Sequence, residues 1–187
     1  MKGIIFTEFL EMVEEENSSA FLEDVIAAAK LGSGGAYTAV GNYPCEELLK
    51  LVRLVSTKTN TTEAILLKRF GERIFMTFCE RFHGLIHHSH SSYNLFEQVE
   101  HTIHREVKKL YPDAECPTFE LERQSPLRYS LIYNSPKPLG DLCEGIINAV
   151  LKYHGEKVIL VRTTLQSSPI TRIRFDFTIQ GGRDGRS

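Results

Sequence analysis

The stretch VEHTIHREVKKLYPDAECPTFELE, residues 99–122, contains the point at which the spacing of apolar residues along the chain changes. Its first half carries Val99, Ile103 and Val107 at intervals of four, which predicts one buried face of a helix. Pro112 cannot continue that helix, so the helix should end at Tyr111-Pro112. The second half alternates apolar and charged residues in Phe119-Glu120-Leu121-Glu122, which predicts a half-buried strand. We therefore expect helices before this point and strands after it.

Upstream of this stretch, helical spacing of apolar residues recurs several times. Helices are predicted over residues 4–15, 21–29, 44–54 and from Asn60 to Phe82. The last of these is expected to start with a capping box formed by Asn60 and Glu63. The polar segment from Gly84 to Ser92 contains His87, His88 and His90 and is predicted to be a solvated loop. A helix resumes at Leu95.

Downstream, the alternation of apolar and polar residues predicts a small sheet. Strands are expected over residues 119–122, 127–133, 157–162 and 172–179, with a helix over 140–152. The fold class is therefore α+β, with an N-terminal helical part followed by a small antiparallel β-sheet with one inserted helix. We expect a single domain over residues 1–180 and a flexible C-terminal tail over residues 181–187.

The composition restricts the possible partners of the chain. A net charge of -2 over 187 residues gives no excess of positive charge for binding nucleic acid. Glu8 interrupts the first apolar run before a signal-peptide core could form. No apolar stretch approaches the roughly 20 residues that cross a bilayer. We expect a cytoplasmic protein that binds neither nucleic acid nor a membrane.

Two segments carry candidate binding residues. His104 lies beside the apolar stripe of the helix that resumes at Leu95, a place where most histidines are ordinary core residues. In Tyr133-Asn134-Ser135-Pro136-Lys137, two hydroxyl groups and a cation follow a predicted strand, and such groups suit carboxylates. Together these segments resemble the haem nitric oxide/oxygen binding (H-NOX) family, in its bacterial stand-alone type. The resemblance extends over nearly the whole chain.

The resemblance implies a haem b cofactor held between the helical part and the sheet, with His104 as the protein ligand of the iron. Tyr133 and Ser135 match the family's Tyr-x-Ser-x-Arg motif, which binds the haem propionates. Lys137 departs from this motif, and its ammonium group gives a less directional clamp than a guanidinium. Pro117 corresponds to the proline that presses against the porphyrin and distorts it. His101 matches no family ligand and is interpreted as a residue of the helix surface or of the surroundings of the site.

The resemblance also implies an apolar wall on the gas-binding side of the haem. Its members are Ile5, Phe9, Ile74, Phe78, Leu142 and Ile146. Leu142 stands where oxygen-binding relatives carry a tyrosine. Bound oxygen carries partial negative charge and needs a donor, whereas nitric oxide binds ferrous iron without one. The expected ligands are nitric oxide and, secondarily, carbon monoxide, with no stable oxygen complex.

The family's mechanism implies that nitric oxide releases His104 from the iron and that the helix then relaxes. Because the chain contains no catalytic motif, we expect no enzyme activity and a separate signalling partner. In bacterial relatives this partner is a histidine kinase or a cyclic-dinucleotide enzyme. Two alternatives remain open: a haem-free redox or zinc-dependent sensor that uses Cys116, Cys143 and the His83 to His90 cluster, and an enzyme of another class.

Overall fold

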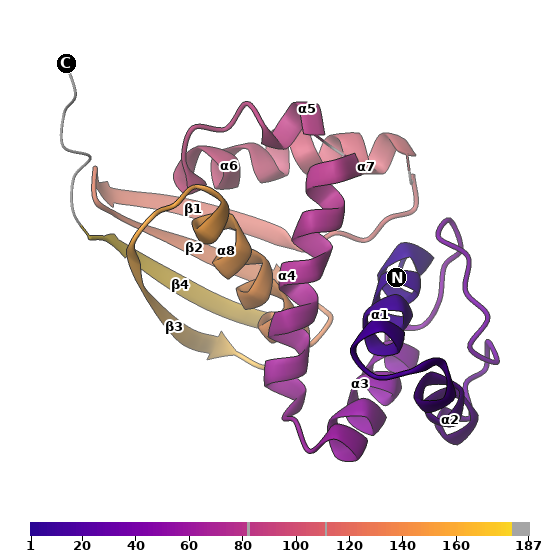
Figure 1. The fold of residues 1–187 in the computed structure, drawn as a ribbon. Coiled ribbons are helices and arrows are strands. Elements are labelled where there is room, and N and C mark those ends of the chain that lie inside the picture. Colours follow the sequence, from indigo (N-terminus) through magenta and orange to yellow (C-terminus); the bar gives the residue numbers. More distant parts are fainter. Residues whose placement is uncertain (82, 111, 181–187) are drawn as a thin grey trace.

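The computed structural model describes residues 1–81, 83–110 and 112–180, and Figure 1 shows helices in its first half and a sheet in its second. The helical elements are α1 (Gly3–Glu16), α2 (Ser19–Ala29), α3 (Cys45–Thr59), α4 (Glu63–Arg81), α5 (His83–Ile86), α6 (Ser92–Gln98), the π-helical segment η1 (Val99–Ile103), α7 (His104–Leu110) and α8 (Gly140–Tyr153). The strands are β1 (Thr118–Ser125), β2 (Arg128–Ser135), β3 (Val158–Gln166) and β4 (Thr171–Ile179). The predicted α+β class is confirmed, and α8 is the inserted helix.

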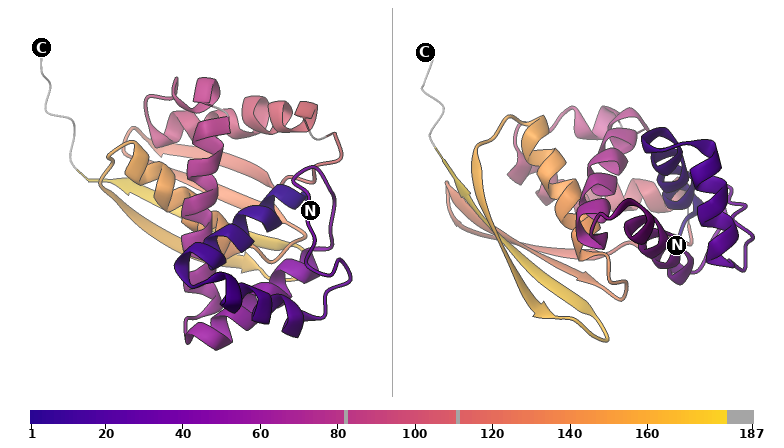
Figure 2. Two further views of the ribbon diagram at one scale, coloured as in Figure 1. Left: turned by 45° about the vertical axis from the view of Figure 1, so that its right-hand side comes forward. Right: turned by 60° about the horizontal axis from the view of Figure 1, so that its bottom comes forward.

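The sheet is antiparallel with the strand order β1-β2-β4-β3. Tyr129 and Leu131 of β2 and Phe175 and Phe177 of β4 are buried and form its inner face, since side chains alternate between the two faces along a strand. Figure 2 shows the helices gathered on this one side of the sheet. The opposite, outer face therefore has no helical cover within the described residues.

Helices α1, α2 and α3 form a second layer beyond α4, which stands between them and the sheet (Figure 1). Their apolar faces meet in a cluster that includes Phe6, Phe9, Leu48 and Phe70, all fully buried. The amphipathic spacing of the sequence thus gives each helix one face to bury. Within the described ranges, no helix combines the length and hydrophobicity needed to cross a membrane.

Helices α4 and α8 cross in close contact because both have a glycine at the crossing. A Cβ atom on Gly71 would overlap the carbonyl oxygen of Leu142, and one on Gly145 would overlap the carbonyl of Lys68. Side chains at these positions would push the two helices apart. Since α4 and α8 join the N-terminal helices to the sheet, this contact fixes the two layers relative to each other.

The variant Gly145→Ala is expected to lower the free energy of unfolding by about 1–3 kcal/mol, because the added methyl group meets rigid backbone. Chemical denaturation followed by circular dichroism measures this change. Gly84→Ala is the matched control, since a Cβ there meets nothing within 4 Å. Equal stability of the two variants would contradict the tight crossing.

The predicted capping box at Asn60 and Glu63 is wrong. Helix α3 continues to Thr59, and Asn60 ends it in the left-handed conformation with φ 53°, which asparagine tolerates better than most residues. The cap of α4 is Thr62, whose hydroxyl accepts a hydrogen bond from the backbone N–H of Ile65 at 3.3 Å. The end of α3 and the start of α4 are only a few residues apart, and a polar residue between them can cap either helix. The sequence pattern assigned Asn60 to the start of α4, whereas it ends α3.

The segment from Gly84 to Ser92 is more ordered than the predicted solvated loop. It includes part of α5, and Ser89 and Ser92 are buried. Helix α6 begins at Ser92, three residues before the expected Leu95, because the Ser91 hydroxyl caps it. The predicted helix ends at Phe82 and Tyr111 and the predicted tail lie outside the described residues.

Candidate functional site

His104 is the first residue of α7 and directly follows η1. Its backbone N–H donates a hydrogen bond to the carbonyl of Val99, five residues earlier, as in a π-helix. Its side chain is only 16% exposed, so the imidazole lies almost entirely within the protein. Single π turns within α-helices occur often at functional sites, and this one ends at the candidate iron ligand.

A carboxylate one turn earlier on the same helix faces His104. Nδ1 of His104 lies 3.4 Å from Oε1 of Glu100, and the same oxygen accepts a hydrogen bond from the backbone N–H of Phe119 at 2.8 Å. With Nδ1 facing the carboxylate, Nε2 is the ring nitrogen suited to bind a metal. Burial lowers the pKa of His104, although Glu100 acts in the opposite direction. A lowered pKa favours the neutral imidazole that metal binding requires.

The helix that carries His104 is attached to the sheet at its N-terminal end. The hydroxyl groups of Ser92 and Tyr129 are 2.6 Å apart, which joins the start of α6 to β2. The backbone N–H of Ser92 also donates to the carboxylate of Glu156 at 3.0 Å. Because Ser92 is fully buried, these bonds are shielded from water. They fix the start of the segment α6-η1-α7, which positions His104.

The end of β2 brings Tyr133 and Ser135 into the protein interior. Their exposed fractions are 3% and 4%, so both hydroxyl groups are withdrawn from bulk water. Burial raises the pKa of Tyr133, which therefore keeps its proton and can act as a donor. The Ser135 hydroxyl accepts a hydrogen bond from the backbone N–H of Lys137 at 3.1 Å, which fixes the turn after the strand.

Lys137 supplies a positive charge in the turn that follows β2. Its side chain is 15% exposed, and Nζ lies 2.7 Å from Oε2 of Glu115, which is 74% exposed. Burial lowers the pKa of the Met1 amino group, and the nearby charge of Lys137 lowers it further. Two ammonium groups and two buried hydroxyl groups suit a ligand with two carboxylates, such as the propionates of haem. The donor set therefore fits haem despite the departure from arginine.

Pro117 is partly buried and immediately precedes β1. On one side of it, Glu115 binds Lys137, and on the other, Phe119 is held by Glu100. Its backbone is thus fixed between the helix of His104 and the turn of Lys137. A rigid proline ring in this position can contact a ligand that is bound between the helix of His104 and the turn of Lys137.

All six predicted wall residues belong to one hydrophobic cluster, in which three are buried and three are partly buried. Two come from each of α1, α4 and α8: Ile5 and Phe9, Ile74 and Phe78, Leu142 and Ile146. Phe78 and Ile146 also pack against the second cluster, which contains Tyr133. The wall thus reaches from the N-terminal helices to the strand end, and its side chains contain no hydrogen-bond donor.

A polar pair joins the two helices that supply four of the wall residues. The Thr77 hydroxyl on α4 donates to Oε2 of Glu8 on α1 at 2.8 Å, and Nε of Arg73 lies 3.7 Å from the same oxygen. Glu8 is only 8% exposed. The hydroxyl of Thr77 is therefore engaged with Glu8, and the pair holds α1 and α4 together.

Among the side chains that the structure describes, the other histidines and cysteines do not group into a second site. His87, His88, His90 and His101 are exposed. Among residues that the structure describes, no three potential ligands lie close enough to hold a metal ion. Burial raises the pKa of the Cys116 and Cys143 thiols, which lowers their reactivity. The alternative of a zinc or redox sensor gains no support from this arrangement.

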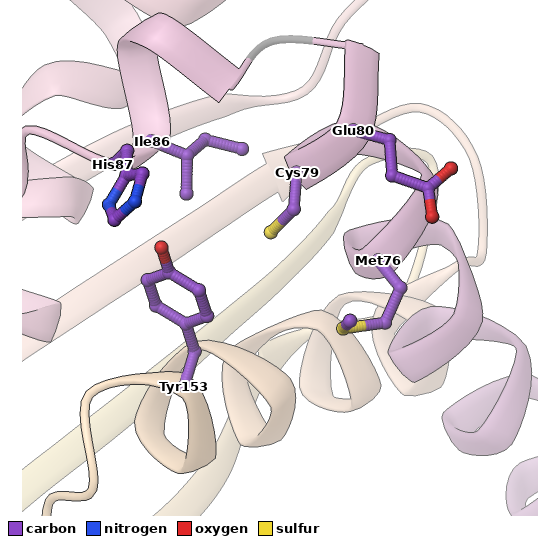
Figure 3. A pocket seen from close by; sticks show the side chains of 6 residues that line it. All are labelled: Met76, Cys79, Glu80, Ile86, His87 and Tyr153. Atoms are coloured by element: carbon purple, nitrogen blue, oxygen red, sulfur yellow. The ribbon is translucent and has the colours of Figure 1, made fainter.

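A cavity of about 380 Å³ lies apart from these residues, where α4, α5 and α8 end. Its lining consists of Met76, Cys79, Glu80, Ile86, His87 and Tyr153. Figure 3 shows the hydroxyl end of Tyr153 pointing toward His87 across the opening. None of the residues predicted to bind haem lines it, so it is a separate feature of the surface.

Comparison with known proteins supports the interpretation of the fold. The sequence profile of a family described as Haem-NO-binding matches residues 2–161. An unliganded Fe(II) H-NOX mutant from K. algicida is 30% identical, with a TM-score of 0.90 over 97% of both chains. A second K. algicida structure is 28% identical, with a TM-score of 0.91 over 100% of both chains. An H-NOX mutant from S. oneidensis, 21% identical over 98% of both chains, shares the fold with a TM-score of 0.86. No curated protein matches the chain.

Fold and family together define the class of haem-based gas-sensor domains. Since the profile covers most of the chain, the chain belongs to the Haem-NO-binding family, also called H-NOX. The family binds haem, and haem is therefore the cofactor. The resemblance inferred from the sequence is confirmed.

Proposed function

We propose that residues 1–180 form one sensor domain that detects nitric oxide at a ferrous haem b ligated by His104. Tyr133, Ser135 and Lys137 bind the propionates, and Pro117 contacts the porphyrin. The observation that carries the proposal is the burial of His104 with Nδ1 facing Glu100, which leaves Nε2 for iron. The hydroxyl and ammonium groups at the end of β2 support it.

The preference for nitric oxide follows from the chemistry of the wall. Its six side chains are hydrocarbons, and the nearby Thr77 hydroxyl is bonded to Glu8. Bound oxygen needs a donor for its partial negative charge, whereas nitric oxide and carbon monoxide do not. The family is described as Haem-NO-binding, and one fold neighbour from S. oneidensis is known in an Fe(II)NO ligation state.

The haem iron would supply the position where the gas binds. The residues of the chain would then transmit the conformational change from this position to other parts of the protein. In our proposal, His104 would hold the iron and would be released from it when nitric oxide binds. Its side chain then remains beside Glu100, whose carboxylate also holds the backbone of Phe119. A displacement of His104 therefore reaches β1 next to Pro117. The gas can shift the conformation because the two states differ in the contacts of His104.

The output of the domain goes to a separate signalling protein. The sequence contains no kinase, cyclase or other catalytic motif, so we propose that the chain is not an enzyme. The proposed partner is a histidine kinase or a cyclic-dinucleotide enzyme. Nitric oxide binding would then change the partner's activity through the surface near β1 and α7.

Absorption spectra of the ferrous protein test this function. Nitric oxide is expected to shift the Soret band, whereas oxygen should give no stable complex, because the wall lacks a donor. Metal analysis should find iron and little zinc. A stable oxygen complex would contradict the argument from the wall. Stoichiometric zinc without a Soret band would contradict the haem site itself.

A further inference from the structure

The outer edge of the sheet at β3 carries exposed apolar side chains. β3 pairs with β4 on one side and ends the strand order, so its other side is open among the described residues. Ile159 and Val161, two residues apart, are 49% and 52% exposed. Leu165, at the bulge between Thr164 and Gln166, is 48% exposed. Figures 1 and 2 show β3 at the margin of the sheet with no helix across its outer face.

The opposite edge of the same sheet differs in charge. β1 carries Glu120, Glu122 and Arg123, all exposed. Charged side chains on an edge strand prevent it from pairing with other strands. β3 contains a single charged residue, Arg162, which bonds to Asp141 and Glu144 of α8 and so belongs to the inner face. The outer face of β3 therefore lacks the protection that β1 has.

The surroundings of β3 define what can cover it. On the neighbouring strand β4, Nε of Arg174 lies 2.8 Å from Oδ1 of Asp176, so the outer face beside β3 has balanced charges. The residues after β4, Gln180 to Ser187, have no apolar side chain. They therefore cannot provide apolar contacts for the exposed side chains of β3. A fitting occupant is an extended, uncharged strand with apolar side chains at alternate positions.

We propose that this occupant is β3 of a second copy of the chain. A two-fold axis at Leu160 pairs the strands antiparallel and places Ile159 of each copy opposite Val161 of the other. Lys157 then lies opposite Thr163 on the same face, so no like charges meet there. On the inner face, Val158 lies opposite Arg162, whose charge its own copy already balances.

The paired strands join two four-stranded sheets into one continuous sheet and close as a dimer, because a two-fold contact leaves no further free β3 edge. One strand pair buries less than the roughly 1,200–2,000 Å² of stable complexes, so the dimer should form only at high concentration. The inference goes beyond gas sensing, since β3 supplies none of the proposed haem contacts.

Sedimentation velocity of the haem-loaded full chain, from about 1 µM to about 300 µM, tests this dimer in the range of weak association. We expect a shift from monomer to dimer in the unmodified chain. Val161→Lys should keep the chain monomeric throughout, because it places two like charges close together near the axis, on adjacent strands of the same face. Glu122→Gln is the matched control, with the same change of charge on the β1 edge, and should dimerise normally.

Val161→Thr adds a milder variant that keeps the branched shape and should weaken the dimer. An unchanged Soret band and circular dichroism spectrum show that each variant is folded. If the unmodified chain is a monomer at all concentrations, the proposal is overturned. The β3 edge would then be free to pair with a strand of another protein. Dimers that persist in Val161→Lys, or larger oligomers, would also overturn it.

Discussion

His104→Gly is expected to yield a folded chain that no longer retains haem. Loss of a group that only orients a metal ligand costs about 10- to 100-fold in affinity, so loss of the ligand itself should cost at least about 100-fold. The remaining contacts at Tyr133, Ser135 and Lys137 bind only the propionates in our proposal. The measurement is a haem titration followed at the Soret band, together with iron analysis of the purified protein.

His101→Gly is the control, because His101 lies on the same helix but is exposed. It should retain haem with an unchanged Soret band. Added imidazole should restore a band in His104→Gly, since the small cavity left by the substitution can accept the free ligand. Full haem occupancy with an unchanged spectrum in His104→Gly would show that another residue binds the iron.

Leu142→Tyr is expected to create an oxygen complex stable enough to record. The tyrosine adds one hydroxyl donor to a wall of hydrocarbon side chains, close to where the gas is proposed to bind. A hydrogen bond to a charged acceptor contributes about 1.5–3 kcal/mol, which corresponds to about a 10- to 100-fold gain in oxygen affinity. Stopped-flow measurement of oxygen dissociation from the ferrous protein gives the size of the effect.

Leu142→Phe has the same ring without the hydroxyl and separates hydrogen bonding from the change in shape. It should bind oxygen no better than the unmodified chain, and nitric oxide binding should persist in both variants. Equal oxygen affinity of the tyrosine and phenylalanine variants would mean that residue 142 does not face the gas.

Local patterns predicted the longer helices and the strands of this fold because each of them obeys one hydrophobic period, whereas the short helix α5 was missed. The change of period around Pro112 separates helix from strand in both the sequence and the structure. The capping error at Asn60 arose because a polar residue between two helices can end one or begin the next. The π turn at Val99–Ile103 has no sequence signature such as proline, since it depends on how the helix packs.

The candidate site was accessible to sequence reasoning where a motif names residue types, as in Tyr133 and Ser135. Glu100 was missed, although a carboxylate four residues before a histidine on a helix is a recognisable pair. Its second contact, with the backbone of Phe119, could not be predicted, because it depends on the path of the chain after the helix. The Glu8 and Thr77 pair was missed for the same reason.

The π turn also determines the azimuth of His104 around the helix axis. Each residue of an α-helix rotates the chain by about 100°, since 3.6 residues complete a turn. The π turn accommodates one additional residue, so conversion of Val99–Ile103 to α-helix would swing the imidazole about 100° around the axis relative to α6. The direction of the proposed iron ligand is thus set by the helical phase of the residues that precede it, none of which is proposed to touch the haem.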